Sequence, residues 1–246
     1  MKARPGLDTH EISARAAAHP LLALLEPRVR AAVITASKLV PYRAGRSVLR
    51  EGDTADRVFA LLDGAVRVFH RAGDGSELLV KLFRAPALFG EMEVLVGSCF
   101  LEHVATLEAS EILQIPAVVF RRLVDGQPSF TRALALDLSA RLCIATHNER
   151  ALGFHDLETR LSNLLLDYAA LASRTTEQGT RIEVALTQDG MARDLAVSRR
   201  SLIRALERLR GLGLIEKVRG RYLIVDLEGL RTRSALRLGL TYRLSP

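Results

Sequence analysis

The segment Leu186–Leu209 constrains this sequence most, because it predicts two short helices joined by a tight turn. Thr187 and Ser198 stand where the helices begin, and such side chains cap the free backbone amides of a helix start. Ala196 and Val197 lie between the two helices and predict the turn. The apolar residues that we expect to face inward are Met191, Ala192, Leu195, Leu202, Leu206 and Leu209.

The second of these helices leaves basic side chains exposed on its first turns, which is the part that a helix-turn-helix inserts into the major groove. Arginine there bonds to guanine through two N–H groups or clamps a phosphate. A two-stranded wing is predicted over Lys217–Val225, and its tip is suited to contacts with the DNA backbone. Arg199 and Arg204 are the candidates for base contacts. The full set expected at DNA is Thr187, Ser198, Arg199, Arg200, Ser201, Arg204, Arg219 and Arg221.

The charge distribution is consistent with this interpretation. From Thr187 to Pro246 the sequence has thirteen Arg or Lys residues against six Asp or Glu, whereas the remainder of the chain is balanced. A basic C-terminal part and a neutral remainder indicate one domain for a polyanion and another for sensing. The alternatives are a helical hairpin whose arginines are merely solvated, and a ligand-binding signalling module that acts through a protein partner.

Short apolar runs separated by glycines fill the stretch Tyr42–Ile115 and predict an antiparallel barrel or sandwich. Asp63-Gly64 and Asp74-Gly75 predict hairpin turns, because glycine accepts the positive φ that a tight hairpin requires.

After Pro116 the apolar spacing becomes helical, and a helix of about 25 residues would be longer than one small barrel can cover. We therefore expect a homodimer seam rather than packing within one chain. Residues 154–156 are predicted to form a hinge, and Cys143 is expected to pack in a core. The seam residues are Phe130, Leu134, Leu138, Leu142 and Ala145.

Two cysteines, Cys99 and Cys143, are too few for a disulfide framework, and no metal-binding motif is present. No apolar run approaches the length of a membrane span and the N-terminus lacks a secretory signal, so a cytoplasmic location without membrane contact is expected. Cys99 and His103 allow a haem-ligand hypothesis or a nucleophile-and-base hypothesis. A surface thiol and a solvated imidazole are favoured over both, and an enzyme is not expected.

Taken together, these blocks resemble the CRP/FNR family of bacterial transcription regulators. The resemblance rests on Arg50–Asp53, Leu62–Gly64, Phe89–Glu91 and the segment from Thr187 to Ile215. It implies an α+β fold with an N-terminal antiparallel β-roll of the cyclic-nucleotide-binding type, a long dimerisation helix and a C-terminal winged helix-turn-helix. The expected boundaries are 1–126, 127–154 and 155–246. It also implies a homodimer on a pseudo-palindromic operator in double-stranded DNA, with RNA polymerase as a further partner.

The sequence departs from the family in two places. Arg200 replaces the family's glutamate in Ser-Arg-Glu-Thr-x-x-Arg, and an arginine has no acceptor for a cytosine amino group. Phe100 and Leu101 align with the pair that holds the phosphate of cyclic AMP, so a phosphate there would lack a positive partner. Control by something other than cyclic AMP or cyclic GMP is therefore expected, although Glu91 retains a position suited to a ribose hydroxyl. The effector pocket is expected to include Gly90, Glu91, Phe100, Leu101 and His103.

Overall fold

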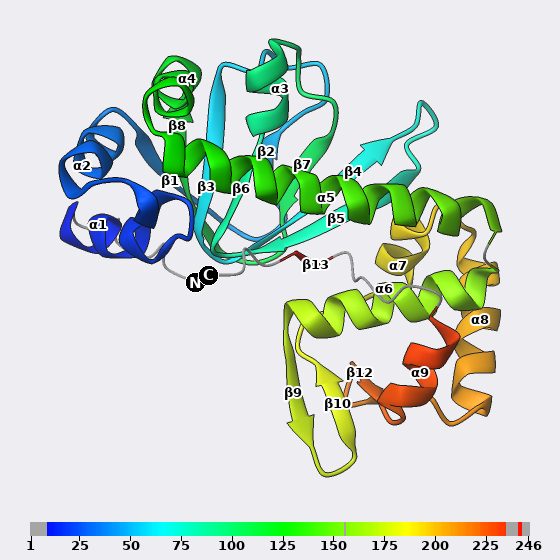
Figure 1. Ribbon diagram of the computed structural model, residues 1–246. Coiled ribbons are helices and arrows are strands. Elements are labelled where there is room, and N and C mark those ends of the chain that lie inside the picture. The colour runs from blue at the N-terminus through cyan, green and yellow to red at the C-terminus, as the bar shows by residue number, and fades with distance from the viewer. Residues whose placement is uncertain (1–8, 155, 235–240, 243–246) are drawn as a thin grey trace. The chain divides into compact units, whose positions relative to one another are not determined.

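The structure is a computed structural model that describes residues 9–154, 156–234 and 241–242 (Figure 1). The chain divides into two compact units. The first consists mainly of residues up to Val68 and of Phe83–Ala140, and the second mainly of Phe69–Leu82 and Arg141–Tyr242. No described helix is long and apolar enough to span a membrane.

The N-terminal half begins with α1 (Thr9–Ala18), the 3₁₀ helix η1 (Leu22–Leu24) and α2 (Pro27–Thr35). Pro27 opens α2, where its missing N–H costs nothing because the first amides of a helix have no helical partner. Strands then follow in rapid succession, interrupted by one short helix. They are β1 (Lys38–Tyr42), β2 (Ser47–Leu49), β3 (Arg57–Asp63), β4 (Ala65–Arg71), β5 (Glu77–Arg84), β6 (Ala87–Phe89), α3 (Glu91–Val96), β7 (His103–Thr106) and β8 (Ser110–Pro116).

These strands form two sheets, and the expectation of an antiparallel β-roll is confirmed. One sheet has the order β1-β8-β3-β6, and the other has the order β13-β5-β4-β7-β2, where β13 is Thr241–Tyr242. Five consecutive residues of β3, Val58–Leu62, are buried, so this strand is covered on both faces. Burial on both faces explains why its sequence is a continuous apolar run and does not alternate.

The two Asp-Gly pairs have different roles, and one prediction is wrong. Asp74-Gly75 joins β4 to β5, which are neighbours in one sheet, so it is a hairpin turn as expected. Asp63-Gly64 joins β3 to β4, which belong to different sheets. It is therefore a corner between sheets and no hairpin. Gly64 has a φ of +92° and lies directly against Ser110, which explains why a residue without a side chain stands there.

Two helices follow the strands: α4 (Ala117–Gly126) and the 27-residue α5 (Pro128–Phe154). At 1.5 Å per residue α5 is about 40 Å long, in agreement with the long helix predicted. Phe130 and Leu134 of α5 are buried, and the Phe130 ring meets Phe120 of α4 edge-on with centroids 6.0 Å apart. These two residues therefore belong to the core of the chain itself and not to an exposed seam.

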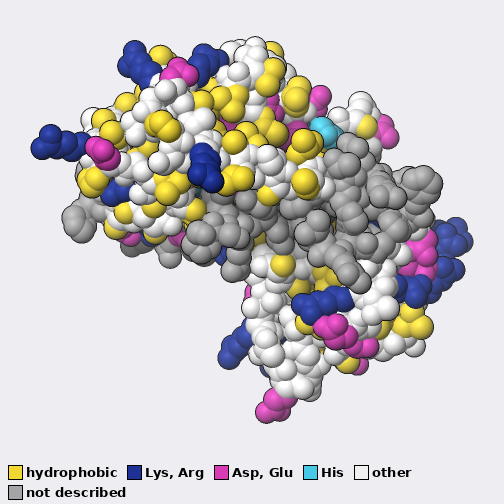
Figure 2. Space-filling view, in the orientation of Figure 1, with side chains coloured by type: hydrophobic (Ala, Val, Ile, Leu, Met, Phe, Trp, Pro, Cys, Tyr) yellow, Lys and Arg dark blue, Asp and Glu magenta, His cyan; other side chains and the backbone are white. Residues whose placement is uncertain are grey.

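The other residues of the predicted seam become more exposed to solvent along α5. Leu138 is half-buried, whereas Leu142 and Ala145 are exposed. Cys143 is also exposed, so its expected place in a core is wrong. Sequence periodicity missed Leu136, which is 64% exposed. Figure 2 shows hydrophobic side chains over the region of the β-roll unit that α5 crosses in Figure 1.

The C-terminal half is built on α6 (Leu157–Leu171), which begins directly after the predicted hinge. His155 of that hinge lies outside the described residues, and Asp156 caps α6 through the amide of Thr159. A four-stranded antiparallel sheet has the order β11-β12-β10-β9. The elements are β9 (Ser173–Thr176), β10 (Gly179–Ile182), α7 (Gln188–Asp194), α8 (Arg199–Gly211), β11 (Ile215–Val218), β12 (Arg221–Ile224) and α9 (Leu227–Arg233).

A pair of glycine substitutions tests the corner between the sheets. A Cβ at Gly64 would lie 2.7 Å from the Ala109 carbonyl oxygen and closer still to Ser110 Oγ. We expect Gly64→Ala to lower the free energy of unfolding by about 3 kcal/mol, because crowding adds to the strain of a positive φ. Chemical denaturation measures this change.

Gly75→Ala is the matched control, since Gly75 has a φ of +83° and no atom lies within 4 Å of the position that a Cβ would take there. It should cost only about 1–2 kcal/mol, from the left-handed backbone alone. Equal effects of the two substitutions would show that the close approach to Ser110 is unimportant.

Candidate DNA-binding interface

The helix-turn-helix consists of α7 and α8, and both predicted caps are confirmed. Thr187 Oγ1 accepts a hydrogen bond from the amide of Gly190 at 3.0 Å, and Ser198 Oγ accepts one from the amide of Ser201 at 3.1 Å. Each cap satisfies an amide that the first turn of a helix leaves without a helical partner. The caps therefore fix where each helix begins and, with it, which side chains stand on the first turn.

The turn between the helices is tight. Ala196 has a φ of +51°, and the amide of Val197 donates to the Ala192 carbonyl at 2.9 Å. A residue with a Cβ is strained in this left-handed region, so tertiary packing must hold Ala196 there. The residues predicted to face inward are all buried, which confirms that part of the prediction: Met191, Ala192, Leu195, Leu202, Leu206 and Leu209.

Polar contacts bind α7 to α6 in addition to the apolar packing. The hydroxyl of Tyr168 donates to Asp194 Oδ2 at 2.7 Å, and both residues are buried. Arg160 Nη2 donates to the Leu195 carbonyl at 2.5 Å, and burial lowers the pKa of this guanidinium. These contacts fix the end of α7 and therefore the turn that sets the angle of α8.

A buried carboxylate binds α8 to α6. Glu158, in the first turn of α6, accepts hydrogen bonds from Arg208 of α8 through Oε1 and from Arg233 of α9 through Oε2, the latter at 2.6 Å. The hydrogen bond from Arg208 is the main reason that the pKa of Glu158 lies below its usual range, and the bond from Arg233 acts in the same direction. One carboxylate thus connects α6 with α8 and with the C-terminal helix α9. We call these three residues the Glu158 clamp.

The first turns of α8 carry three exposed arginines, Arg199, Arg200 and Arg204. Arg200 and Arg204 make no hydrogen bond or ion pair with any residue that the structure describes. Arg199 lies next to the first turn of α7, where its Nε is 3.4 Å from Asp189 Oδ1 and its Nη2 is 3.4 Å from Gln188 Oε1. Ser201 is half-buried, and its hydroxyl lies 2.9 Å from that of Ser198.

The wing is formed by β11 and β12, in agreement with the prediction, but its two arginines differ. Arg219 lies at the tip with a φ of +50° and is exposed. Arg221 instead donates a hydrogen bond to the Glu183 carbonyl. Arg221 therefore joins the wing to the segment after β10, and its predicted phosphate contact would require this bond to break.

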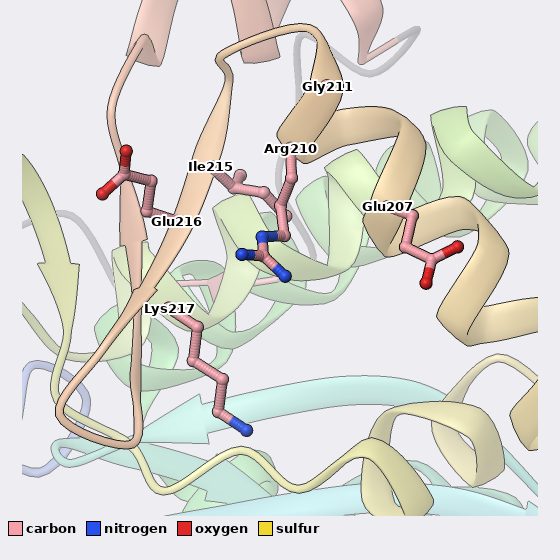
Figure 3. Close-up of a pocket in the computed structure, with 6 residues that line it drawn as sticks. All are labelled: Glu207, Arg210, Gly211, Ile215, Glu216 and Lys217. Carbon is pink, nitrogen blue, oxygen red and sulfur yellow. The ribbon is translucent and has the colours of Figure 1, made fainter.

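A shallow depression lies between the end of α8 and β11 (Figure 3). Arg210 of α8 and Lys217 of β11 project to the same side, and Glu216 projects away from them. Lys217 Nζ also lies 5.5 Å from the centre of the Tyr222 ring. Arg210 and Lys217 were not predicted as DNA-binding candidates, although basic residues at the end of the second helix and at the start of the wing were a usable signal. Gln188 and Asp189 were not predicted either.

The basic C-terminal residues are only partly described. Arg233 belongs to the Glu158 clamp, and Arg231 forms an ion pair with Glu228 at 2.6 Å. Leu230, which directly precedes Arg231, is fully buried, so α9 packs as an amphipathic helix. Arg237 and Arg243 lie outside the described residues.

Two of the predicted effector-pocket residues, Gly90 and Phe100, lie in or against a cluster of phenylalanine side chains. We use the name aromatic cluster for Phe59, Phe83, Phe89 and Phe100. The ring of Phe59 stacks on Phe89 with centroids 5.1 Å apart and lies 5.9 Å from Phe100, and Phe83 and Phe89 are 6.1 Å apart. A Cβ on Gly90 would lie 3.1 Å from both Phe59 and Phe100, so the structure brings Gly90 and Phe100 together.

The remaining pocket residues are dispersed. Glu91 is fully buried, whereas Leu101 is 60% exposed. His103 Nε2 lies 3.7 Å from Glu51 Oε2, and Cys99 is exposed. Among the described residues, no group of three His, Cys, Asp or Glu side chains has an arrangement that could hold a metal ion.

The Glu158 clamp makes stability depend on pH. A depressed folded-state pKa stabilises the fold above the unfolded pKa of about 4.3, and this contribution is lost as the pH falls through the folded value. We expect Glu158→Gln to lower the free energy of unfolding at pH 7 by about 2 kcal/mol, because two charge-assisted hydrogen bonds are weakened. Chemical denaturation between pH 7 and pH 3 should show the difference from wild type shrinking below about pH 4.

Glu228→Gln is the control, since it removes an exposed carboxylate that pairs with Arg231 in the same domain. It should change stability very little at any pH, because exposed ion pairs contribute little. A Glu158→Gln effect of constant size across the pH range would contradict the electrostatic role of the clamp.

Comparisons with known proteins agree with both halves of the architecture. Residues 39–127 match the cyclic nucleotide-binding domain family, and residues 159–233 match the Crp-like helix-turn-helix domain family. The CRP-like cAMP-activated global transcriptional regulator of Mycobacterium tuberculosis is 26% identical over 210 residues, which cover 85% of this chain and 94% of the relative. The global nitrogen regulator of Synechococcus elongatus is 24% identical over 71% of this chain and 79% of the relative.

Among solved structures, the c-di-GMP responsive global regulator CLP of Xanthomonas campestris has the same fold. The TM-score is 0.71 at 22% identity, and the match covers 82% of this chain and 100% of the other. The two domain matches together span most of the sequence. On these grounds the chain belongs to the CRP/FNR family of transcription regulators.

Proposed function

We propose that this protein binds double-stranded DNA as a homodimer and that each protomer inserts α8 into the major groove of one half of a pseudo-palindromic operator. The observation that carries the proposal is the pair Arg200 and Arg204, exposed on the first turns of a helix whose other side is fully buried. A helix held rigidly on one side with free cations on the other is suited to a polyanion. Arg219, Arg210 and Lys217 extend the positive surface to the wing and are assigned to phosphates.

Within this interface we assign base reading to Arg199 and Arg204. Arg200, with Thr187, Ser198 and Ser201 at the helix starts, is assigned to the backbone. Because Arg200 has only donors, the half-site should differ from the TGTGA type that the family's glutamate reads. Arg221 is left out of the phosphate-binding set, since it already donates to the Glu183 carbonyl.

The proposed dimer contact is the exposed face of α5. Five side chains share this face by their helical spacing: Ala135, Leu136, Ser139, Leu142 and Cys143. Leu136 and Leu142 are 64% and 68% exposed, and two exposed leucines on one long helix are typical of a surface that a second copy covers. This face replaces the expected seam from Phe130 and Leu134, whose side chains are buried in the same chain.

We further propose that cyclic AMP does not control this protein, although the Mycobacterium relative is described as cAMP-activated. The position expected to hold the cyclic phosphate is filled by Phe100, which packs on Phe59 and over Gly90. The neighbouring Glu91 carboxylate is fully buried. A phosphate brought against this apolar surface and a carboxylate would lose its hydration without gaining a positive partner. The cytoplasmic location expected from the sequence, and RNA polymerase as the further partner that the resemblance implies, are part of this proposal.

Arg204→Ala tests the DNA interface. With an operator selected from a random duplex pool, we expect the variant to bind about 5- to 150-fold more weakly, which corresponds to about 1–3 kcal/mol. The loss should be concentrated at one base pair of each half-site. Fluorescence anisotropy at a fixed salt concentration measures it, and the wild type should show a steep loss of affinity with increasing salt.

Arg122→Ala is the matched control, because Arg122 is an equally exposed arginine on α4 of the β-roll. It should leave DNA affinity unchanged. The same titrations are repeated with cyclic AMP, which should have no effect. An Arg204→Ala variant that binds like the wild type would contradict the interface, and activation by cyclic AMP would contradict the assignment of the aromatic cluster.

A double substitution, Leu136→Asp with Leu142→Asp, tests the dimer face. The two carboxylates would meet their symmetry mates in an apolar contact, so we expect a monomer by sedimentation velocity and a loss of operator binding. Both positions are exposed in the single chain, so the circular dichroism spectrum should stay unchanged.

Val118→Asp provides the control, since Val118 is 55% exposed on α4 and is not part of the proposed face of α5. This variant should remain dimeric. If the double variant also remained dimeric, the subunit contact would have to lie elsewhere.

A further inference from the structure

The contacts of Arg199 with α7 were not foreseen from the sequence. Asp189 and Gln188 occupy the first turn of α7, and both contact the guanidinium at 3.4 Å. Arg199 and Asp189 are 62% and 69% exposed, so no buried environment forces them together. An exposed ion pair of this kind is weak and rearranges easily. Its importance lies in the orientation that it gives to Arg199.

The two contacts use one side of the guanidinium. Asp189 lies at Nε, and Gln188 Oε1 accepts one hydrogen of Nη2. A guanidinium has five N–H donors in a rigid fork, so both hydrogens of Nη1 and one of Nη2 remain available. These are the donors at the outer end of the side chain, which can reach guanine O6 and N7 together. The contacts with α7 therefore leave Arg199 equipped for bidentate recognition of guanine.

The charge of Asp189 has a second consequence. Asp189 lies beside Arg199, which is proposed to enter the major groove. Its carboxylate therefore comes close to the phosphates whenever the domain binds a duplex. Repulsion between like charges weakens binding to every sequence. Only a site with a guanine opposite Arg199 offsets this penalty. There the free Nη donors can both bond to the base, which no other sequence allows.

We propose that Asp189, assisted by Gln188, is a specificity-determining residue that orients Arg199 toward guanine and disfavours binding to unrelated DNA. This inference rests on the proposed function, since it assumes that α8 enters the major groove. Asp189 acts through Arg199 and makes no base contact of its own. Removing its charge should therefore strengthen non-specific binding and weaken discrimination, two opposite changes that a loss of fold would not produce.

The test compares Asp189→Asn with wild type in the intact dimer. The probes are the selected operator, a set of operators in which each G·C pair is replaced by A·T in turn, and a duplex of random sequence. We expect Asp189→Asn to bind the random duplex at least about threefold more tightly, because one repulsive charge is gone. The penalty for replacing one particular G·C pair should fall at least about threefold, while the penalties at the other pairs stay the same.

Two further variants separate charge from orientation. Glu207→Gln removes an exposed carboxylate from α8 that has no contact with Arg199 among the described residues. It should raise affinity for all duplexes alike and leave discrimination intact. Gln188→Ala removes an orienting contact without a change of charge, so it should reduce discrimination at the same G·C pair and leave binding to the random duplex unchanged.

The inference is overturned if Asp189→Asn keeps the full penalty at every G·C pair, or if it relaxes all pairs equally. The proposed function fails in a different way, through a wild-type protein that binds all duplexes with one affinity. A wild type with clear base preferences and an unaltered Asp189→Asn profile would therefore reject the role of Asp189 while leaving the DNA-binding function in place.

Discussion

The packing of α8 on α6 is the interaction on which the DNA-binding half depends. Leu202, Leu206 and Leu209 bury one side of α8, and the Glu158 clamp fixes the helix with charge-assisted hydrogen bonds. Because that side is held, the opposite side can present cations to solvent without losing its orientation. Glu158 stands in the first turn of α6, so its two hydrogen bonds connect that helix with both α8 and α9.

The β-roll illustrates how one fold accommodates different interiors. It consists of antiparallel sheets, and its sequence matches the cyclic nucleotide-binding domain family over residues 39–127. At the position that the family resemblance assigns to such a ligand's phosphate, this chain has Phe100, whose ring lies 5.9 Å from that of Phe59. Stacked rings bury a large apolar area and exclude water, which is the opposite of what a phosphate requires. The fold therefore identifies the family, and the interior decides the ligand.

Much of the local structure could be predicted from the sequence because it depends on neighbours in the chain. The caps at Thr187 and Ser198, the buried leucines of α8 and the wing all follow from short-range rules of capping and periodicity. The same rules gave a wrong prediction for one of the two Asp-Gly dipeptides, because both have the same composition. Asp63-Gly64 has the composition of a hairpin turn but joins strands of different sheets, since strand partners are chosen by distant residues.

The sequence alone thus determined the family, the order of the elements and the side of α8 that faces solvent, because these depend on periodicity and short motifs. Only the tertiary structure decided which charged residues remain free. Arg221 was expected to contact DNA, yet it donates a hydrogen bond that joins the wing to the segment after β10. Arg233 donates to the buried Glu158 carboxylate. The tertiary structure also divided the α5 stripe into a buried and an exposed part. Contacts between residues far apart in the chain decide which charges are paired and which side chains of α5 are buried. A local sequence pattern cannot predict such contacts.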